Sequence, residues 1–365
     1  MIIYLILLGL ILLEGIIIFY YGKSNKNKNI YLILVFFQLF FVSAFRSPEI
    51  GVDTSMYYSF FSGLNYLSEY HIWNIYFEKG YILFNIIVNF IFNFNQSIIM
   101  ITSLIILILI TLFIKNNSRN LWLSVYFFIT LMFFYNSINI LRQFIAMAIV
   151  INSIYFVRKQ KLVPFLLLIG LAYSFHTSAL IFIIVYFFAR MKFTLKKVLY
   201  SIFFAIGSFF VLFPIIQWVM LKLPRYSGYT KFFQSYELGN IINTLIYASI
   251  LILSLIVNYY KKPILNNIGT NLDYKRSNEN IFTFIILTAT ILSFLSIRMS
   301  ILGRIVDYFS LFSIVFIPNV ISCIKDKYLR LIVTFFIMCL TFAYNIFIFI
   351  YRPEWFGVTP YKFFW

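Results

Sequence analysis

The chain has 365 residues, of which 62% are hydrophobic and only 11% are charged. A water-soluble domain of this length could not bury that much apolar surface, so the composition excludes a soluble globular protein and indicates a membrane protein. The formal net charge of +18 would suit a nucleic-acid-binding protein. Most of the cations, however, lie in short loops between apolar runs, as the positive-inside rule describes, so nucleic acid is not an expected partner.

Repeated apolar runs of membrane-spanning length predict an all-α polytopic membrane protein, and the alternating ten-residue strands of a β-barrel are absent. The first run, 1–21, lacks a basic start and a small-residue cleavage site, so it is interpreted as a retained span. The next span, 30–45, leads into a polar loop at 46–80, and a polar tail covers 351–365. The other spans are expected at 97–114, 121–135, 138–157, 162–175, 177–190, 198–218, 241–260, 281–297, 303–322 and 331–350. Together they predict about twelve transmembrane helices in a single integral membrane domain, 1–365.

The apolar segment 81–95 is interpreted as re-entrant or interfacial. Asn85 and Asn89, with Asn93, recur every four residues and would place a polar stripe along one side of a helix. If this segment and 97–114 both crossed the membrane, every later basic loop would lie outside. With one crossing, the later basic loops lie in the cytoplasm, and the loop 46–80 and the tail are external.

Sorting the cations by side separates lysine from arginine. The expected inner loops hold 19 of the 29 Lys and Arg, and 14 of those 19 are lysines. The outer side holds ten cations, six of them arginines: Arg46, Arg142, Arg225, Arg298, Arg304 and Arg352. Arginine forms bidentate contacts with phosphate oxygens, so this enrichment favours a phosphate-bearing ligand at the outer face. Snorkelling of side chains at the membrane surface is the alternative, and it explains six arginines less well than one or two.

Three of these arginines lie at the ends of apolar runs. Arg142 is placed about one turn inside a span, and Arg298 ends another, so both are interpreted as functional because ionisable groups at membrane depth are costly. Arg304 begins the following span, three residues before Asp307. That spacing suits an ion pair within one helix as well as a functional role.

Two further residues are candidates for proton transfer. His176 lies in a predicted outer turn, where it is either a general base that deprotonates a hydroxyl or a polar turn residue beside a helix cap. Asp53 is either a base, a ligand for sugar hydroxyls or an arginine, or an ordinary turn residue before a helix. Gly51 permits the turn, and Thr54 is expected to cap a helix that begins at Ser55.

The sequence carries no recognisable metal or cofactor motif. Cys323 and Cys339 have no metal-like spacing and fall in or beside apolar segments, so they are interpreted as small apolar residues. A Walker loop, HExxH, GxSxG and HxxxxD are also absent, which argues against serine hydrolases and the usual membrane acyltransferases. No metal and no cofactor are therefore expected.

Short motifs spread over nearly the whole chain resemble the EpsG family of membrane proteins, which are similar to the Wzy-type polymerases of bacterial polysaccharide. The carrying residues are Arg46 with Gly51-Val-Asp53-Thr54 and Tyr57; Leu141-Arg142-Gln143 with Ala146; Ala172 and Phe175-His176-Thr177-Ser178; Arg225-Tyr226 and Tyr229; Arg298, Gly303-Arg304, Tyr308 and Pro318; and Pro360-Tyr361. The segment around Gly51 and the Leu-Arg-Gln motif match most clearly, whereas Arg225 and the tail match loosely.

The resemblance implies a metal-independent glycosyltransferase, with a fold similar in outline to the GT-C enzymes and the O-antigen ligases. It would join repeats carried on undecaprenyl pyrophosphate at the outer face of the bacterial cytoplasmic membrane, with a flippase and a chain-length regulator as further partners. Binding of pyrophosphate and sugar would fall to Arg46, Arg142, Gln143, Arg225, Arg298, Arg304, Tyr57 and Tyr308. His176, or failing it Asp53, would take the proton, and the aromatic loop 57–81 would stack on sugars.

Two other functions remain open. A flippase for the same lipid-linked sugar would need charged groups along a path through the membrane, but the inner halves of the spans carry almost none except Glu14. A ligase or a polysaccharide-modifying transferase would share the donor-binding chemistry, so the sequence does not separate it from a polymerase.

Overall fold

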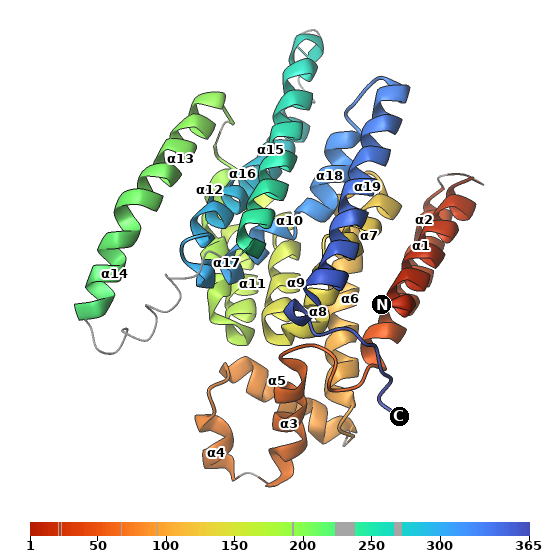
Figure 1. Cartoon of the computed structure of the whole chain (residues 1–365), viewed down its shortest axis with the longest axis vertical. Helices are drawn as coiled ribbons and strands as arrows, with labels where there is room; N and C mark the ends of the chain where they lie inside the picture. The colour runs from red at the N-terminus through yellow and green to blue at the C-terminus, as the bar shows by residue number, and fades with distance from the viewer. Residues whose placement is uncertain are drawn as a thin grey trace. The chain divides into compact units, whose positions relative to one another are not determined.

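The computed structural model describes residues 1–20, 22, 24–66, 68–92, 94–191, 193–222, 238–265 and 272–365. Within these residues the regular structure is helical, and the only extended pairing is an isolated bridge between Arg46 and Phe363 (Figure 1). The helices form two compact units. A single integral membrane domain stays a prediction.

The first unit comprises residues 1–153, 167–179 and 314–365. Its helices are α1 (Ile2–Tyr20), α2 (Asn25–Ala44), α3 (Thr54–Gly63), η1 (Leu64–Tyr66), α4 (Glu69–Asn74), α5 (Lys79–Phe92), α6 (Ser97–Asn117), α7 (Leu121–Thr130), α8 (Phe133–Asn139), α9 (Leu141–Asn152), the second half of α11 (Leu162–Phe175), the start of η2 (Thr177–Ile184), α18 (Ser313–Ile321), α19 (Lys327–Tyr351) and η6 (Pro353–Trp355). The helix α6 packs against α2 and α9, and α1 packs against α2 and α7.

The second unit comprises residues 154–166 and 180–313. It contains α10 (Ile154–Arg158), α12 (Val185–Phe188), α13 (Leu195–Gly207), η3 (Ser208–Leu212), α14 (Phe213–Lys222), α15 (Leu238–Leu265), α16 (Leu272–Ser296), η5 (Ser300–Leu302) and α17 (Gly303–Ser310). Here α16 packs against α13, α15 and α17.

In the described residues, seven helical segments are long and apolar enough to cross a membrane, or nine if two bent pairs each count as one span. The expected spans at 162–175, 177–190 and 281–297 correspond to shorter apolar helices of 10–17 residues. A span needs roughly 20 residues, so the count of twelve stays a prediction. The helix α5 has 14 residues. It would be about 21 Å long, less than the ~30 Å hydrocarbon core, which agrees with a re-entrant or interfacial segment.

The predicted external loop and the tail lie at the same end of the first unit. Figure 1 shows α3, α4 and α5 gathered at the end where α2 finishes and the tail lies. Three backbone hydrogen bonds join loop and tail: Ser47 N–H to Lys362 O (2.9 Å), Phe364 N–H to Phe45 O (3.1 Å) and Gly51 N–H to Gly357 O (2.8 Å). Loop and tail therefore meet at one end of the first unit, and their placement together on the external side of the membrane stays a prediction.

The end of α6 and the turn after it contact α18. The backbone N–H of Arg119 donates to the side chain of Asn319 at 2.7 Å, and Asn319 donates to the carbonyl of Asn117 at 2.8 Å. These hydrogen bonds join segments of the first unit that are about 200 residues apart in sequence.

A break divides the predicted span 121–135 into α7 and α8, which meet at 56°. Met132, at the break, has a φ of +69°, which an α-helix cannot continue through. Asn345 of α19, 1% exposed, donates to the carbonyl of Ile129 at 3.3 Å and lies 3.1 Å from the Met132 sulfur. The carbonyl of Ile129 also accepts the backbone N–H of Met132 at 3.0 Å, so the amide adds a donor from α19 at the break.

We expect Asn345→Leu to destabilise the protein by about 1–2 kcal/mol, because the break loses its side-chain hydrogen bond to α19 inside the bundle. Thermal unfolding in detergent measures the change. Cys339→Leu, which adds leucine at an exposed position on the same helix, is the control and should leave the melting temperature unchanged. Equal melting temperatures for both variants would contradict the role of Asn345.

Candidate functional site

Arg142 lies at the start of α9 and is held by aromatic rings from two segments. Its guanidinium carbon is 5.6 Å from the ring centre of Tyr57, 4.5 Å from that of Phe77 and 5.9 Å from that of Tyr81. Aromatic faces attract cations at such distances. The side chain remains 15% exposed. Arg142 is therefore a charged group that is mostly enclosed but still reachable from outside the protein.

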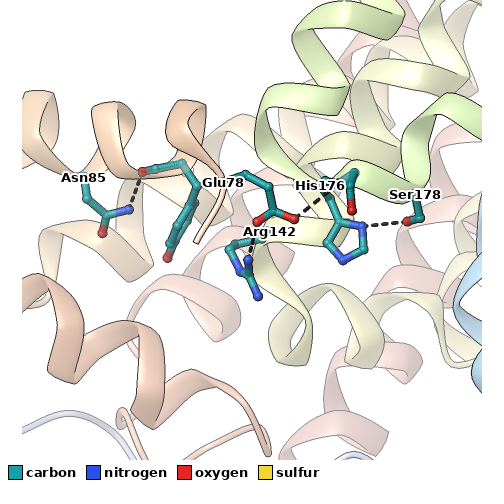
Figure 2. Close-up of polar contacts among 7 residues, drawn as sticks. Glu78, Asn85, Arg142, His176 and Ser178 are labelled. Carbon is teal, nitrogen blue, oxygen red and sulfur yellow. Dashed lines mark hydrogen bonds and ion pairs between the residues drawn. The ribbon is translucent and has the colours of Figure 1, made fainter. Parts of the chain in front are cut away.

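Glu78 completes the enclosure, and it was not among the predicted site residues. One carboxylate oxygen, Oε2, pairs with Arg142, and the other, Oε1, accepts the backbone N–H of Thr177 at 3.3 Å. Figure 2 shows Glu78 between Arg142 and the turn that carries His176 and Ser178. The carboxylate therefore connects the loop 46–80 to α9 and to the start of η2, just after α11.

His176 follows the last residue of α11, and its backbone N–H donates to the carbonyl of Ala172 at 3.0 Å. The imidazole is half-buried, and its Nδ1 lies 2.6 Å from the hydroxyl oxygen of Ser178. This contact allows the tautomer in which Nδ1–H donates to Ser178 and Nε2 carries the lone pair that accepts a proton. The turn thus orients the imidazole in a way that suits a base.

Arg46 is placed differently from the prediction. It is 0% exposed and donates to the carbonyls of Ser43 and, at 2.9 Å, Ile138. Burial lowers the pKa of the guanidinium to about 10, which leaves it charged at neutral pH. The Ser43 carbonyl lies in the last turn of α2, where the helix dipole favours a cation. The guanidinium therefore joins α2 to α8, and it points into the protein.

Asp53 has a carboxylate without a hydrogen-bond or ion-pair partner in the described part of the chain. Its backbone N–H donates to the side chain of Asn139 at 2.9 Å, and it lies one turn of α3 before Tyr57, the ring beside Arg142. The predicted cap is wrong: α3 begins at Thr54, whose hydroxyl donates to the carbonyl of Ile138 at 3.0 Å and not to its own helix.

Gly51 forms the predicted turn with a φ of +95°, a value that favours glycine. A Cβ there would lie 3.1 Å from the carbonyl oxygen of Ile138. The turn thus lets the backbone of the loop approach α8 closely enough for the Asp53–Asn139 contact.

The first unit brings Tyr57, Arg142 and His176 together around Glu78, with Asp53 one helical turn away from Tyr57. Gln143, beside Arg142, is 3% exposed. The rings of Tyr57, Phe77 and Tyr81 surround Arg142, whereas Tyr66, Trp73 and Tyr76 are exposed, and stacking of the loop on sugars stays a prediction.

Three predicted residues belong to the second unit. Arg298 donates to the carbonyl of Phe209 at 2.7 Å, and its guanidinium carbon lies 5.7 Å from the Phe209 ring centre. Arg304 is exposed, and Tyr308 is fully buried. Arg225 lies outside the described residues. Convergence of Arg298 and Arg304 on the Arg142 site stays a prediction.

Gly80 lets α5 approach the end of α11, two residues after Glu78. A Cβ at Gly80 would lie 2.6 Å from the Cβ of Ser174 and 2.7 Å from its carbonyl oxygen, both closer than real contacts allow. Any side chain here would push α5 away from the turn that carries His176. The glycine therefore sets the spacing across which Glu78 reaches Thr177.

We expect Gly80→Ala to lower the melting temperature and to cost activity, because α5 must move away from Ser174. Gly63→Ala, at the end of α3, is the control, since a Cβ there meets nothing within 4 Å. Thermal unfolding and product formation measure both variants. A Gly80→Ala protein that matches Gly63→Ala in both assays would show that the close approach is unimportant.

Among the described residues, no group of three or more His, Cys, Asp or Glu could hold a metal ion. The site offers instead one enclosed cation, two carboxylates and an imidazole. This combination suits the binding of an anionic group beside a proton acceptor.

The helices and the polar site at one end of the first unit define a multi-pass membrane protein. The chain belongs to the EpsG family, whose model matches residues 29–363. This is a family of Wzy-like polysaccharide polymerases, so membership indicates a role in polymerising polysaccharide. No curated protein and no solved structure matches the chain.

Proposed function

We propose that the protein is a GT-C-like glycosyltransferase that joins oligosaccharide repeats carried on undecaprenyl pyrophosphate. The reaction would take place at the outer face of the bacterial cytoplasmic membrane. The family match over residues 29–363 carries the polymerase role. The grouping of Arg142, Glu78 and the His176 turn at one end of the first unit supports the assignment of residues.

In the proposed reaction, a hydroxyl of the acceptor repeat attacks the anomeric carbon of the donor. A new glycosidic C–O bond forms as the C–O bond to pyrophosphate breaks, and direct displacement inverts the anomeric centre. Nε2 of His176 takes the hydroxyl proton, because Nδ1 faces Ser178. The carboxylate of Asp53 is the alternative base.

Arg142 would stabilise the negative charge that develops on the leaving pyrophosphate. Arg298 and Arg304 would add further cations to the same group. Arg46 is assigned a different part, because its N–H groups point to the carbonyls of Ser43 and Ile138: it would hold the loop in place without touching substrate.

Purified protein in liposomes, supplied with lipid-linked repeats, tests the proposal. A ladder of longer lipid-linked chains is the expected product, with EDTA leaving the ladder unchanged. A single transfer to an unrelated acceptor would indicate a ligase, and movement of repeats across the bilayer without a new glycosidic bond would indicate a flippase. Either outcome would overturn the polymerase assignment. Co-purification tests the flippase and chain-length regulator as partners.

A further inference from the structure

Glu78 has two partners that come from different parts of the chain. Its Oε2 pairs with Arg142 on α9, and its Oε1 accepts the N–H of Thr177, the residue that follows His176 (Figure 2). The side chain is only 16% exposed. Both oxygens are thus used: one contacts Arg142, and the other contacts the residue next to His176.

The arrangement exceeds what neutralising Arg142 requires. A counter-ion needs only one oxygen near the guanidinium, and any direction of approach would serve. Here the second oxygen is fixed to the backbone beside His176, and Gly80 brings the start of α5 against Ser174 on the same turn. The position of the carboxylate is therefore set from both sides, and it links the positions of Arg142 and His176.

We propose that Glu78 is a positioning residue, whose carboxylate keeps the Arg142 guanidinium and the His176 turn at a fixed spacing. This inference rests on the proposed function, in which Arg142 must stabilise the leaving pyrophosphate while His176 takes the proton of the attacking hydroxyl. Catalysis by positioning is sensitive to displacements of about 1 Å, which cost roughly 100-fold in rate.

Glu78→Asp tests the spacing, because it keeps the charge and shortens the side chain by one methylene. We expect kcat to fall about 100-fold while KM changes by less than about three-fold and the melting temperature stays close to that of the wild type. Glu49→Asp is the matched control, since Glu49 lies in the same loop but pairs with Lys362 at the exposed surface. A purely structural role would lower the melting temperature of Glu78→Asp and spare kcat in the protein that remains folded, and that result would overturn the proposal.

A second measurement does not depend on catalysis. Phenylglyoxal modifies accessible arginines, and mass spectrometry reports the modification of Arg142 alone. In Glu78→Gln the Thr177 N–H keeps an acceptor but Arg142 loses its carboxylate, so we expect labelling of Arg142 to rise at least about three-fold, with no rise in Glu49→Gln. Unchanged labelling would overturn the proposal.

The two measurements separate the two claims. If the wild type makes no polymer but Glu78→Gln exposes Arg142 to phenylglyoxal, the proposed function fails and the contact of Glu78 with Arg142 stands. If the wild type polymerises and both Glu78 variants behave as the Glu49 variants do, the function stands and the positioning role fails.

Discussion

Arg142→Ala is expected to reduce polymer formation by about 100-fold or more, because it removes the cation proposed to stabilise the leaving pyrophosphate. It also leaves Glu78 partly buried without its partner, which costs stability. Purified protein that remains folded is therefore compared with the wild type, with rates of chain elongation as the measurement.

Arg142→Lys separates charge from geometry. Lysine keeps the charge but lacks the planar fork that contacts two oxygens and stacks between the rings of Tyr57 and Phe77, so it should restore little of the rate. Arg352→Ala is the control, because this arginine is exposed and pairs only loosely with Glu354 at 3.7 Å. Wild-type rates in the folded Arg142→Ala protein would remove Arg142 from the mechanism.

His176→Ala is expected to lower the rate of chain elongation by about 100-fold or more, since a positioned base contributes roughly 10²–10⁴-fold. The chain supplies its own control, because it contains one other histidine. His71 is exposed in α4 and contacts Ser68, so His71→Ala should keep the wild-type rate. If His176→Ala remains active and Asp53→Asn does not, the base is Asp53.

The helices, and the grouping of the loop 46–80 with the tail, could be predicted from sequence because both depend on the contrast between lipid and water. Apolar runs must form helices in lipid, and the distribution of lysine assigned the loop 46–80 and the tail to one side, where Ser47 and Gly51 now bond to the tail. The cost of an arginine at membrane depth likewise singled out Arg142.

The same arguments could not name the partner of each arginine. A partly buried arginine such as Arg142 is commonly paired with a carboxylate, yet the choice of Glu78 among the acids of the loop depends on how α5 packs against α11 through Gly80. The partners of Arg46 could not be predicted either. They are the backbone carbonyls of Ser43 and Ile138, and every residue type has such a carbonyl.

The contact between loop and tail can form only late in synthesis, after the tail has been made. Gly51 bonds to Gly357, and Tyr361 donates to Val42, 319 positions earlier. The ribosome makes these tail residues long after the loop has left the tunnel, and such distant pairings form slowly because the intervening chain must first be arranged. A chain halted before α19 would therefore lack the contacts that the tail makes with the end of α2 and the start of the loop.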